Sequence, residues 1–484
     1  MEAMTFVLFG ATGDLAKRKI YPALYNLYVD QKMPKAFSVI GLGRKEVSDS
    51  EFQARVEDSL NTFSRRSPED AAKVRDFLGA FRYTSLNNKN IEDYNKLLDV
   101  VERREQELGI PQNRMFYLSV APEFFEPIAE NIKNSGLGSG SGWKRLIIEK
   151  PFGHDLSSAR RLNEKLSNTF AEEEIYRIDH FLGKPMVQNM EVLSATNPVI
   201  QALWGNHFIS NIQITASETV GVEERAAYYD QTGAVRDMFQ NHMLQLLMMI
   251  ALHLPKKSTP EEIRFKKKNT AEAMSPLLKE ELNKNIVRAQ YRAGELQGKP
   301  VVSYLDEPGI ESTSKNDTYF AARVYLDDPF WKEVPFYVRT GKRLKEKSTR
   351  IVVEFKKPLN TGVPADDNLG ANLLIIDIGP KEGMRIQLNA KSPMHHDTIE
   401  PMELSYTSSY DNVPEAYENL IFDALRGDAT FFAHWDEVEL SWKWVQPILE
   451  AFTANEVPLH YYEAGTEGPE AALELLAQDG NEWH

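Results

Sequence analysis

The run YRIDHFLGKPMVQN at residues 176–189 gathers four side chains that can carry charge, namely Arg177, Asp179, His180 and Lys184. Apolar residues stand between them. The run is therefore either a solvated helix face with ion pairs or one half of a site that holds an anion. Lysine and arginine bind phosphate groups, and an imidazole near a carboxylate can act as a general base close to neutral pH. The second interpretation needs partner residues elsewhere in the chain.

A second candidate for the base is His242, in a helical pattern over residues 234–252 that is rich in Leu and Met. An imidazole in such a helix is more often a packed core residue than a base. A carboxylate that fixes the tautomer and raises the pKa of the ring would favour catalysis. Asp179 is a candidate for that carboxylate, if the fold brings it to His242.

A glycine-rich turn, GATGDLA at residues 10–16, follows the apolar run 5–8 and precedes a helical pattern. In this context glycines let the backbone approach a pyrophosphate, and the helix N-terminus supplies N–H groups. The spacing is GxxGxxA rather than GxGxxG, so the motif alone also fits a plain tight turn. Pro22 predicts a short first turn or a kink in the helix that follows.

The next predicted strand ends in Arg44 and Lys45, where an NAD-binding fold usually presents an acid to the ribose 2′-hydroxyl. A cation there accommodates a 2′-phosphate, which favours NADP over NAD. An exposed basic turn is the plainer alternative, and the glycine turn upstream favours the cofactor interpretation.

A third motif, Glu149-Lys150-Pro151, stands at the end of another apolar run. Ligands of doubly wound sheets bind beyond the carboxyl ends of the strands, so Lys150 is placed to reach a cofactor or substrate. The alternative is a surface lysine at a strand end. Pro151 would hold the turn in one geometry, with a cis or a trans peptide.

The elements that must position these residues differ between the two parts of the chain. Apolar runs at residues 5–8, 37–42, 115–120 and 145–149 alternate with charged, amphipathic stretches at 51–62 and 90–108. This alternation predicts an α/β, Rossmann-like, doubly wound domain over residues 1–180.

Beyond residue 180, six apolar runs follow one another with turns between most of them. They predict a larger α+β domain over residues 181–484, with a mainly antiparallel sheet. The helical patterns at 234–252 and 414–451 are expected to cover one face of that sheet. The six runs are HFISNIQITASE, TYFAARVYLDD, PFYVRTGKRL, TRIVVEF, NLLIIDI and MRIQLNA.

Composition narrows the class of protein. At 484 residues, with 42% hydrophobic and 26% charged residues, the chain is typical of a globular protein of more than one domain. The excess of 71 acidic over 56 basic residues argues against nucleic-acid binding, because contacts with phosphates need a basic surface. We expect neither a membrane span nor a signal peptide, and the chain has no cysteine for disulfides or thiolate metal sites. These features predict a cytoplasmic protein.

Several segments, in this order, resemble the glucose-6-phosphate dehydrogenase family: LFGATGDLAKRKIYP, EKPFG, RIDHFLGK, YYDQTGAVRDMFQNH, FYVRTGKRL and RGDATFFAHWDEVE. The resemblance spans nearly the whole chain, and RIDHFLGK is its most specific part. It implies oxidation of glucose 6-phosphate at C1, with NADP as the first choice of cofactor and NAD as the second. The product would be 6-phosphoglucono-lactone, in the first step of the oxidative pentose phosphate pathway.

The resemblance also implies a role for individual residues. His242 would be the general base and Asp179 the carboxylate that stabilises its imidazolium. No metal is expected, because hydride transfer asks for positioning and one base. A homodimer or homotetramer is expected by resemblance. The remaining candidates are His180, Lys184, Lys150, Glu218, Asp237, Lys342 and Lys347 for the substrate, and Gly10, Gly13, Asp14, Leu15, Lys19, Arg44 and again Lys150 for the cofactor.

Two positions depart from the family pattern. Phe181 stands where the family usually has a tyrosine that helps hold the phosphate. Its loss removes a neutral hydrogen bond of about 0.5–1.5 kcal/mol, roughly a few-fold to tenfold in affinity. Pro185 stands where a polar residue is common. Neither position touches the expected base or its carboxylate.

Two other functions are consistent with parts of the pattern. A sugar oxidoreductase of the glucose–fructose oxidoreductase type also joins a Rossmann fold, an EKP turn and a sheet domain, but needs no second phosphate-binding cluster. Comparing the turnover of glucose 6-phosphate with that of free glucose separates the two. A non-catalytic, NADP-binding regulator would be expected to lack the base, whereas His242, Asp179 and Lys184 are all present.

Overall fold

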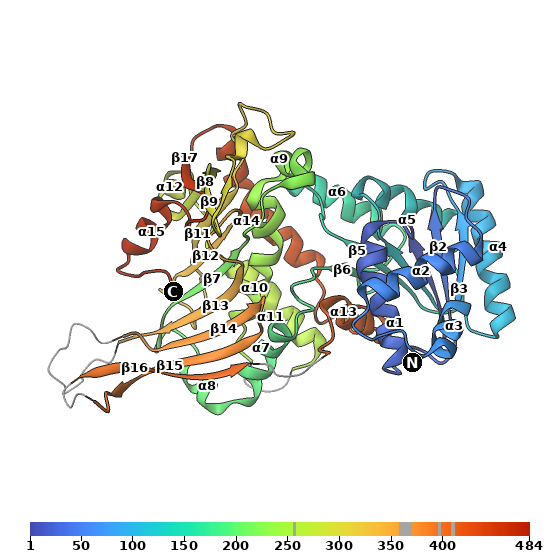
Figure 1. The fold of residues 1–484 in the computed structure, drawn as a ribbon, viewed down its shortest axis with the longest axis horizontal. Helices are drawn as coiled ribbons and strands as arrows, with labels where there is room; N and C mark the ends of the chain where they lie inside the picture. The colour runs from blue at the N-terminus through green and yellow to red at the C-terminus, as the bar shows by residue number, and fades with distance from the viewer. Residues whose placement is uncertain (255–257, 358–369, 395–397, 408–411) are drawn as a thin grey trace. The chain divides into compact units, whose positions relative to one another are not determined.

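The chain divides into two compact units in the computed structural model, which describes residues 1–254, 258–357, 370–394, 398–407 and 412–484. The first unit comprises Met1–Lys184 and Tyr410–Glu439, and the second comprises Pro185–Ser409 and Leu440–His484. Besides the division expected near residue 180, the chain thus returns to the first unit late in the sequence, a feature that no sequence pattern indicated. Figure 1 shows the elements of each unit.

The first unit is built on a six-stranded parallel sheet with the order β3-β2-β1-β4-β5-β6. This is the strand order of a Rossmann fold, which confirms the predicted fold class. The interior strands read as continuous apolar runs because helices cover both faces of such a sheet. The strands are β1 (Met4–Phe9), β2 (Phe37–Gly43), β3 (Phe81–Ser85), β4 (Arg114–Leu118), β5 (Lys144–Glu149) and β6 (Ile175–Ile178).

Of the five helices that lie between β2 and β6, four begin at polar capping residues. The side chains of Ser48, Asp70, Asn90 and Asp155 each accept a hydrogen bond from a backbone N–H in the first turn of the helix that follows. Gly109, at φ +61°, ends the longest of them. They are α2 (Asp49–Phe63), α3 (Ala71–Gly79), α4 (Ile91–Leu108), α5 (Phe125–Asn134) and α6 (Leu156–Ser167), with the short turns η2 (Pro122–Phe124) and η3 (Glu172–Glu174).

The helix after the glycine turn changes type just before Pro22. A π-helical segment, η1 (Ala16–Ile20), leads directly into α1 (Tyr21–Val29), and Pro22 occupies the first turn of α1. Proline has no N–H to donate to the preceding turn, so the helix changes its hydrogen-bonding period where the ladder of backbone bonds is interrupted. The expected interruption is therefore a change of helical pitch.

The return of the chain to the first unit forms helix α13 (Ala416–Arg426). Leu420, Ile421, Ala424 and Leu425 belong to the same buried apolar cluster as residues of β1 and α1. The prediction that helices over 414–451 cover the antiparallel sheet is wrong for this helix. Its amphipathic pattern shows that one face is buried, but any apolar sheet face would satisfy it.

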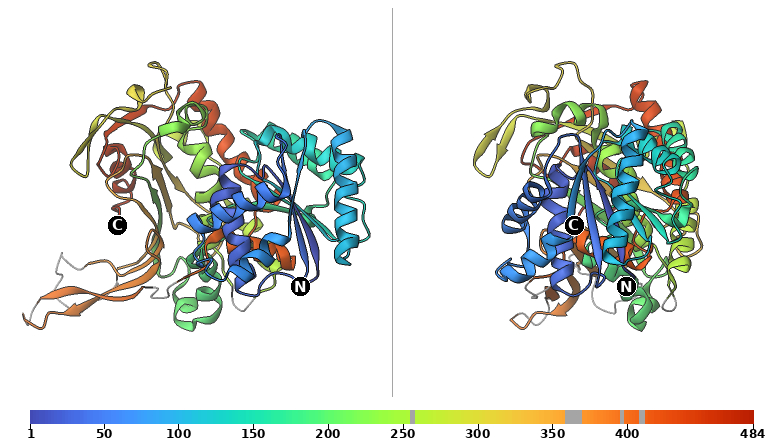
Figure 2. Two further views of the ribbon diagram at one scale, coloured as in Figure 1. Left: turned by 45° about the vertical axis from the view of Figure 1, so that its right-hand side comes forward. Right: turned by 90° about the vertical axis from the view of Figure 1, so that its right-hand side faces the viewer.

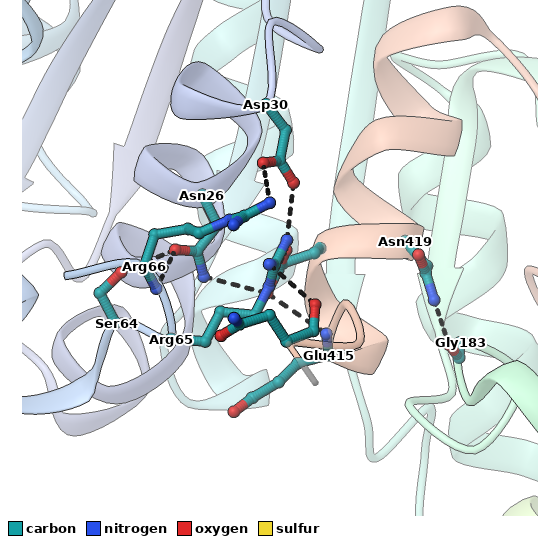
Figure 3. A network of polar contacts seen from close by, with 10 residues as sticks. Asn26, Asp30, Ser64, Arg65, Arg66, Gly183, Glu415 and Asn419 are labelled. Atoms are coloured by element: carbon teal, nitrogen blue, oxygen red, sulfur yellow. Dashed lines mark hydrogen bonds and ion pairs between the residues drawn. The ribbon is translucent and has the colours of Figure 1, made fainter. Parts of the chain in front are cut away.

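A buried ion-pair network fastens α13 to α1 (Figure 3). Glu418 is 2% exposed and accepts a 2.7 Å bond from Arg65 and a 3.0 Å bond from Asn26. Arg65 also pairs with Asp30 at 2.7 Å, and Asn419 donates to the carbonyl of Gly183 at 3.0 Å. Removing one partner from a buried pair leaves an uncompensated charge and typically costs about 3–5 kcal/mol. The network therefore stabilises the return segment on the first unit.

The second unit contains a nine-stranded sheet with the order β16-β15-β14-β13-β7-β12-β11-β8-β17. Only the pairs β7–β12 and β8–β17 run parallel, so the mainly antiparallel prediction is confirmed. Figure 2 shows β14–β16 extending as a ribbon beyond the rest of the sheet. The strands are β7 (Ile209–Ser217), β8 (Ile286–Arg292), β11 (Tyr319–Val324), β12 (Phe336–Gly341), β13 (Ser348–Phe355), β14 (Leu373–Gly379), β15 (Gly383–Lys391), β16 (Ile399–Thr407) and β17 (Leu459–Glu463), with a separate hairpin of β9 (Gly294–Leu296) and β10 (Lys299–Val301).

The helical pattern predicted at 234–252 forms a π-helix, η5 (Val235–Met243), that continues as α10 (Leu244–Ile250). Every residue of α10 is buried, and η5 contacts β12. No helix among the described residues is long and apolar enough to cross a membrane. The other helices are α7 (Pro185–Thr196), α8 (Pro198–Leu203), η4 (Glu223–Arg225), α9 (Ala226–Ala234), α11 (Pro260–Ala273), η6 (Lys279–Glu281), α12 (Leu282–Asn285), η7 (Tyr304–Asp306), α14 (Trp435–Thr453) and α15 (Glu470–Ala477).

Candidate active site

The site residues predicted in the first unit lie at one edge of its sheet. Gly10 follows β1, Arg44 follows β2, Lys150 follows β5 and Asp179 follows β6. All carboxyl ends of a parallel sheet meet at the same edge, which is where open α/β sheets bind their ligands. Motifs far apart in the sequence are thus brought to one edge by topology alone.

The turn after β1 can only be made with glycine at its first position. Gly10 has φ +80°, and a Cβ atom on it would lie 2.0 Å from the carbonyl oxygen of Ser119. The N–H of Gly13 donates to the carbonyl of Gly10 at 2.9 Å, and Asp14 and Leu15 start the helical stretch. Ala16 is fully buried, which permits close helix–sheet packing. This arrangement fits a pyrophosphate-binding turn at a helix N-terminus.

Arg44 is exposed beyond the end of β2, and in the described parts of the chain its side chain has no hydrogen-bonding or ionic partner. The turn itself is held by the hydroxyl of Tyr83, which donates to the carbonyl of Lys45 at 2.8 Å. A guanidinium without an internal counter-ion, on a fixed turn, fits the recognition of a phosphate group.

Lys19 lies in η1 and pairs with Glu415 at 2.6 Å, in the return segment just before α13. Both side chains are about half exposed, so the pair contributes little to stability. The pair does hold the ammonium group of Lys19 on the side of the glycine turn that faces the return segment. An anionic ligand that engages Lys19 has to compete with Glu415.

The EKP turn contains a partly buried carboxyl group. Glu149 accepts hydrogen bonds from Tyr117 on β4 at 2.6 Å and from Tyr417 on α13 at 3.4 Å. Burial, with Asp179 adding to it, raises the pKa of Glu149 to about 7, although Lys150 and the two tyrosines oppose the rise. The peptide between Lys150 and Pro151 is cis. The return helix thus contributes a side chain to the same strand end as Lys150.

The RIDHFLGK run is a strand followed by a tight turn, so the alternative of a solvated helix face is wrong. Asp179 is 2% exposed, and its carboxylate accepts the N–H of Phe181 at 3.0 Å. The expectation that position 181 does not touch this carboxylate is therefore wrong, because the contact is made by the backbone, which no side-chain pattern reveals. Its carbonyl accepts the N–H of Leu182 at 3.0 Å. Arg177 is buried on β6 and pairs with Glu172 at 2.5 Å, which makes it a structural residue.

Phe181 contacts two neighbouring side chains of this turn, His180 and Lys184. Its ring is 5% exposed, lies 4.9 Å from the ring of His180 and has the ammonium of Lys184 4.3 Å from its centroid. A phenylalanine face attracts a cation even though it offers no hydroxyl. The position that departs from the family pattern therefore orients Lys184 by a cation–π contact.

In the second unit, Asp237 and His242 lie on the π-helix η5. They are 5% and 1% exposed, and the i→i+5 period of a π-helix sets them about one turn apart. Asp237 also lies 3.7 Å from Arg225. Because π-helical turns occur often at functional sites, this conformation favours a role for His242 over simple core packing.

Lys342, just beyond β12, is brought to Glu218, just beyond the parallel strand β7. The two side chains pair at 2.6 Å, and the ammonium of Lys342 lies 4.9 Å from the centroid of the Tyr229 ring. Lys347 is exposed between β12 and β13, and its side chain pairs with no other group in the described residues. The structure therefore joins Lys342 with Glu218 and leaves Lys347 outside that pair. The pairing of Asp179 with His242 would draw one residue from each unit and stays a prediction.

Comparison with known proteins identifies the family of this chain. The model of the glucose-6-phosphate dehydrogenase NAD binding domain matches residues 7–189, and that of the C-terminal domain matches residues 191–484. The chain belongs to the glucose-6-phosphate dehydrogenase family. It is 46% identical to a glucose-6-phosphate 1-dehydrogenase of Bacillus subtilis over 99% of this chain and 97% of that protein. The corresponding enzyme of Leuconostoc mesenteroides is 41% identical over 100% and 99%.

A solved structure shows the same fold over the whole length. Glucose-6-phosphate dehydrogenase in complex with its substrate glucose-6-phosphate superimposes with a TM-score of 0.91, at 34% identity, and covers 100% of this chain and 99% of that one. The family recognised from the glycine turn, the EKP turn and RIDHFLGK is thereby confirmed. The sequence analysis did not identify Tyr417, which contacts Glu149, or Glu415, which contacts Lys19, because no local motif marks them.

The raised pKa of Glu149 predicts that the stability of the fold depends on pH. A pKa of about 7 in the folded chain, against 4.5 for the free side chain, means that the folded state holds this proton more tightly. The stabilising contribution is fully present below pH 4.5 and is lost as pH rises through 7. The loss is at most on the order of 3 kcal/mol. The glutamine in Glu149→Gln does not titrate. The thermal-unfolding midpoint of this variant should therefore rise relative to that of the wild type between pH 5 and pH 8.

The matched control is Glu123→Gln, at an exposed glutamate of the same unit, which should follow the wild type across that range. If the difference between Glu149→Gln and the wild type is the same at both pH values, Glu149 does not titrate between them in the folded chain.

Proposed function

We propose that this chain oxidises glucose 6-phosphate at C1 with NADP and releases 6-phosphoglucono-lactone. The observation that carries the proposal is the full-length match to glucose-6-phosphate 1-dehydrogenases, one of which is solved in complex with its substrate glucose-6-phosphate. The side chains that this reaction requires, a base, its carboxylate and several cations, all occur in this chain. Their positions at strand ends and on η5 support the proposal.

His242 acts as the general base in this mechanism. It takes the proton of the C1 hydroxyl while the C1–H bond breaks, with its electron pair leaving as hydride, and a C1=O bond forms. The carboxylate of Asp179 stabilises the imidazolium and fixes the tautomer of the ring. The turn bond from the N–H of Phe181 holds that carboxylate in one orientation.

Cations from several strand ends bind the phosphate of the sugar. His180 and Lys184 come from the turn after β6, Lys150 from the end of β5 and Lys342 from the end of β12. Glu218 and Asp237 accept hydrogen bonds from sugar hydroxyls in this scheme. Lys347, which is exposed, is a further candidate for binding the substrate. Glu218 pairs with Lys342 in the structure, so the phosphate of a bound substrate competes with Glu218 for the ammonium group of Lys342.

The dinucleotide binds at the edge formed by β1 and β2. Gly10 and Gly13 let the backbone approach the pyrophosphate, and Lys19 reaches the ligands from η1. Arg44 binds the 2′-phosphate, which makes NADP the first choice and NAD the second. When bound, NADP accepts the hydride on its nicotinamide ring.

We further propose that the enzyme acts in the cytoplasm as a homodimer or homotetramer. The edge strand β16 supports self-association, because it is exposed along nearly its whole length. Its apolar residues Met402, Leu404 and Tyr406 are 41%, 55% and 52% exposed. An exposed apolar edge strand is a surface that proteins normally cover.

The role of His242 is tested by His242→Asn. Without the base, turnover of glucose 6-phosphate should fall by a factor of about 100 or more while substrate and NADP binding are largely kept. The measurement is steady-state kcat together with ligand affinity. His253→Asn is the matched control, because His253 stacks on Phe330 at 4.0 Å in the same unit and should leave kcat unchanged. Near-wild-type turnover of His242→Asn would rule out this mechanism.

The role of Arg44 is tested by Arg44→Ala. Loss of the guanidinium should raise the KM for NADP much more than the KM for NAD, because only NADP carries the 2′-phosphate. Arg75→Ala, at another exposed arginine of the first unit, should change neither value. Equal changes in both KM values for Arg44→Ala would exclude the 2′-phosphate role.

A further inference from the structure

The helix that carries His242 is capped by a residue from a distant part of the chain. The N–H of Val235, the first residue of η5, donates to the carboxylate of Asp317 at 3.1 Å. The preceding N–H, of Ala234, donates to the carbonyl of Asp317 at 3.1 Å. The residue at the helix N-cap makes no side-chain cap of its own. Asp317 therefore satisfies two backbone donors at the start of this helix.

The chain just before the helix is shaped to meet Asp317. Gly233 has φ +68°, and a Cβ atom there would lie 2.7 Å from a carboxylate oxygen of Asp317 and 2.7 Å from the side-chain oxygen of Asn316. Asn316 in turn donates to the carbonyl of Tyr229 at 2.8 Å. Residues 316 and 317 thus pack against the end of α9 and the start of η5, and only a glycine at position 233 permits that close approach.

The next residue, Thr318, holds the lysine beyond β12. Its carbonyl accepts the N–H of Lys342 at 3.0 Å. The hydroxyl of Tyr462 lies 3.1 Å from the hydroxyl of Thr318 and donates to the carbonyl of Lys342 at 2.6 Å. Two consecutive residues, Asp317 and Thr318, therefore connect the helix of His242 to Lys342 through buried hydrogen bonds.

We propose that Asp317 is a positioning residue for the reaction: its carboxylate sets the start of η5, and through that helix the place of His242 relative to the sugar held by Lys342. This inference deepens the proposed function and rests on His242 being its base. Asp317 is 6% exposed, so the cap is shielded from competing water. A negative group at a helix N-terminus is also favoured by the aligned peptide dipoles.

Charged groups around the cap keep the carboxylate paired with the helix. Burial raises the pKa of Asp317, whereas the N–H of Val235 and the charges of Arg236 and Arg288 lower it. An asparagine in this position would keep an oxygen that can accept the Val235 N–H. An alanine would leave that buried N–H without its acceptor.

The test compares Asp317→Ala with Asp317→Asn in the full chain. We expect Asp317→Ala to lower kcat for glucose 6-phosphate by between about tenfold and a hundredfold, because a small misplacement of a base is costly. The KM for glucose 6-phosphate should stay within about twofold, since the contact from Thr318 to Lys342 is made by the backbone. The acid limb of the kcat/KM profile should move to lower pH, because a displaced His242 loses part of the support of the Asp179 carboxylate. Asp317→Asn should restore kcat and the profile.

A second readout does not depend on activity. Hydrogen–deuterium exchange of backbone amides over residues 234–243 should speed up in Asp317→Ala and stay near the wild-type rate in Asp317→Asn. The matched control is Asp328→Asn, at another carboxylate of the same unit that accepts a backbone N–H, from Phe330 at 2.8 Å, but caps a different turn. It should leave both the exchange over 234–243 and the pH profile unchanged.

Two results would overturn the inference: wild-type kcat, pH profile and exchange in Asp317→Ala, or equal impairment of the Ala and Asn variants. The failure of the proposed function is recognised separately, because His242→Asn would then keep its turnover whereas the exchange measurement would still report whether Asp317 caps η5.

Discussion

In a parallel sheet every strand ends at the same edge, and this constraint organises the first unit. The glycine turn, Arg44, the EKP turn and Asp179 are separated by long stretches of sequence, yet each directly follows a strand. None of them needs a contact with another to be brought to that edge. The requirement for close backbone approach is met at Gly10, where a side chain would collide with Ser119. The remaining positions at the edge carry charged side chains.

The return of the chain as α13 adds further contacts at this edge. Its apolar face packs with β1 and α1, and Glu418 is held in a buried network by Arg65 and Asn26. From this anchored helix Tyr417 reaches Glu149, and the preceding Glu415 reaches Lys19. A late segment of the chain thus contacts both the EKP turn and the helix of the glycine turn. In the second unit Asp317 and Thr318 connect η5 to Lys342 in a comparable way.

Much of this arrangement could be predicted from the sequence, because the information is local. A run such as residues 37–42, apolar throughout and bounded by glycine and charge, predicts a buried strand, and the alternation with helices predicts the parallel sheet. The change of helix type before Pro22 also follows from a local property, the missing N–H of proline. The family could be recognised from motifs whose spacing is short.

What could not be predicted depends on contacts between distant residues. The pattern of α13 shows an apolar face but does not say which sheet it covers, and it was assigned to the wrong one. Nothing in the sequence near His242 marks Asp317 as the cap of its helix, because the acceptor comes from the segment just before β11. The short apolar piece of β6 was hidden among the charges of RIDHFLGK. Such features depend on tertiary packing, which a local pattern does not encode.

The central claim is that hydride leaves C1 of glucose 6-phosphate and passes to the dinucleotide. The most direct measurement uses glucose 6-phosphate that carries deuterium at C1, with NADP, and follows the isotope by mass spectrometry of both products. The account predicts one deuterium in each molecule of reduced dinucleotide and none at C1 of the lactone. Reduced dinucleotide without deuterium, or no reaction with glucose 6-phosphate, would contradict it.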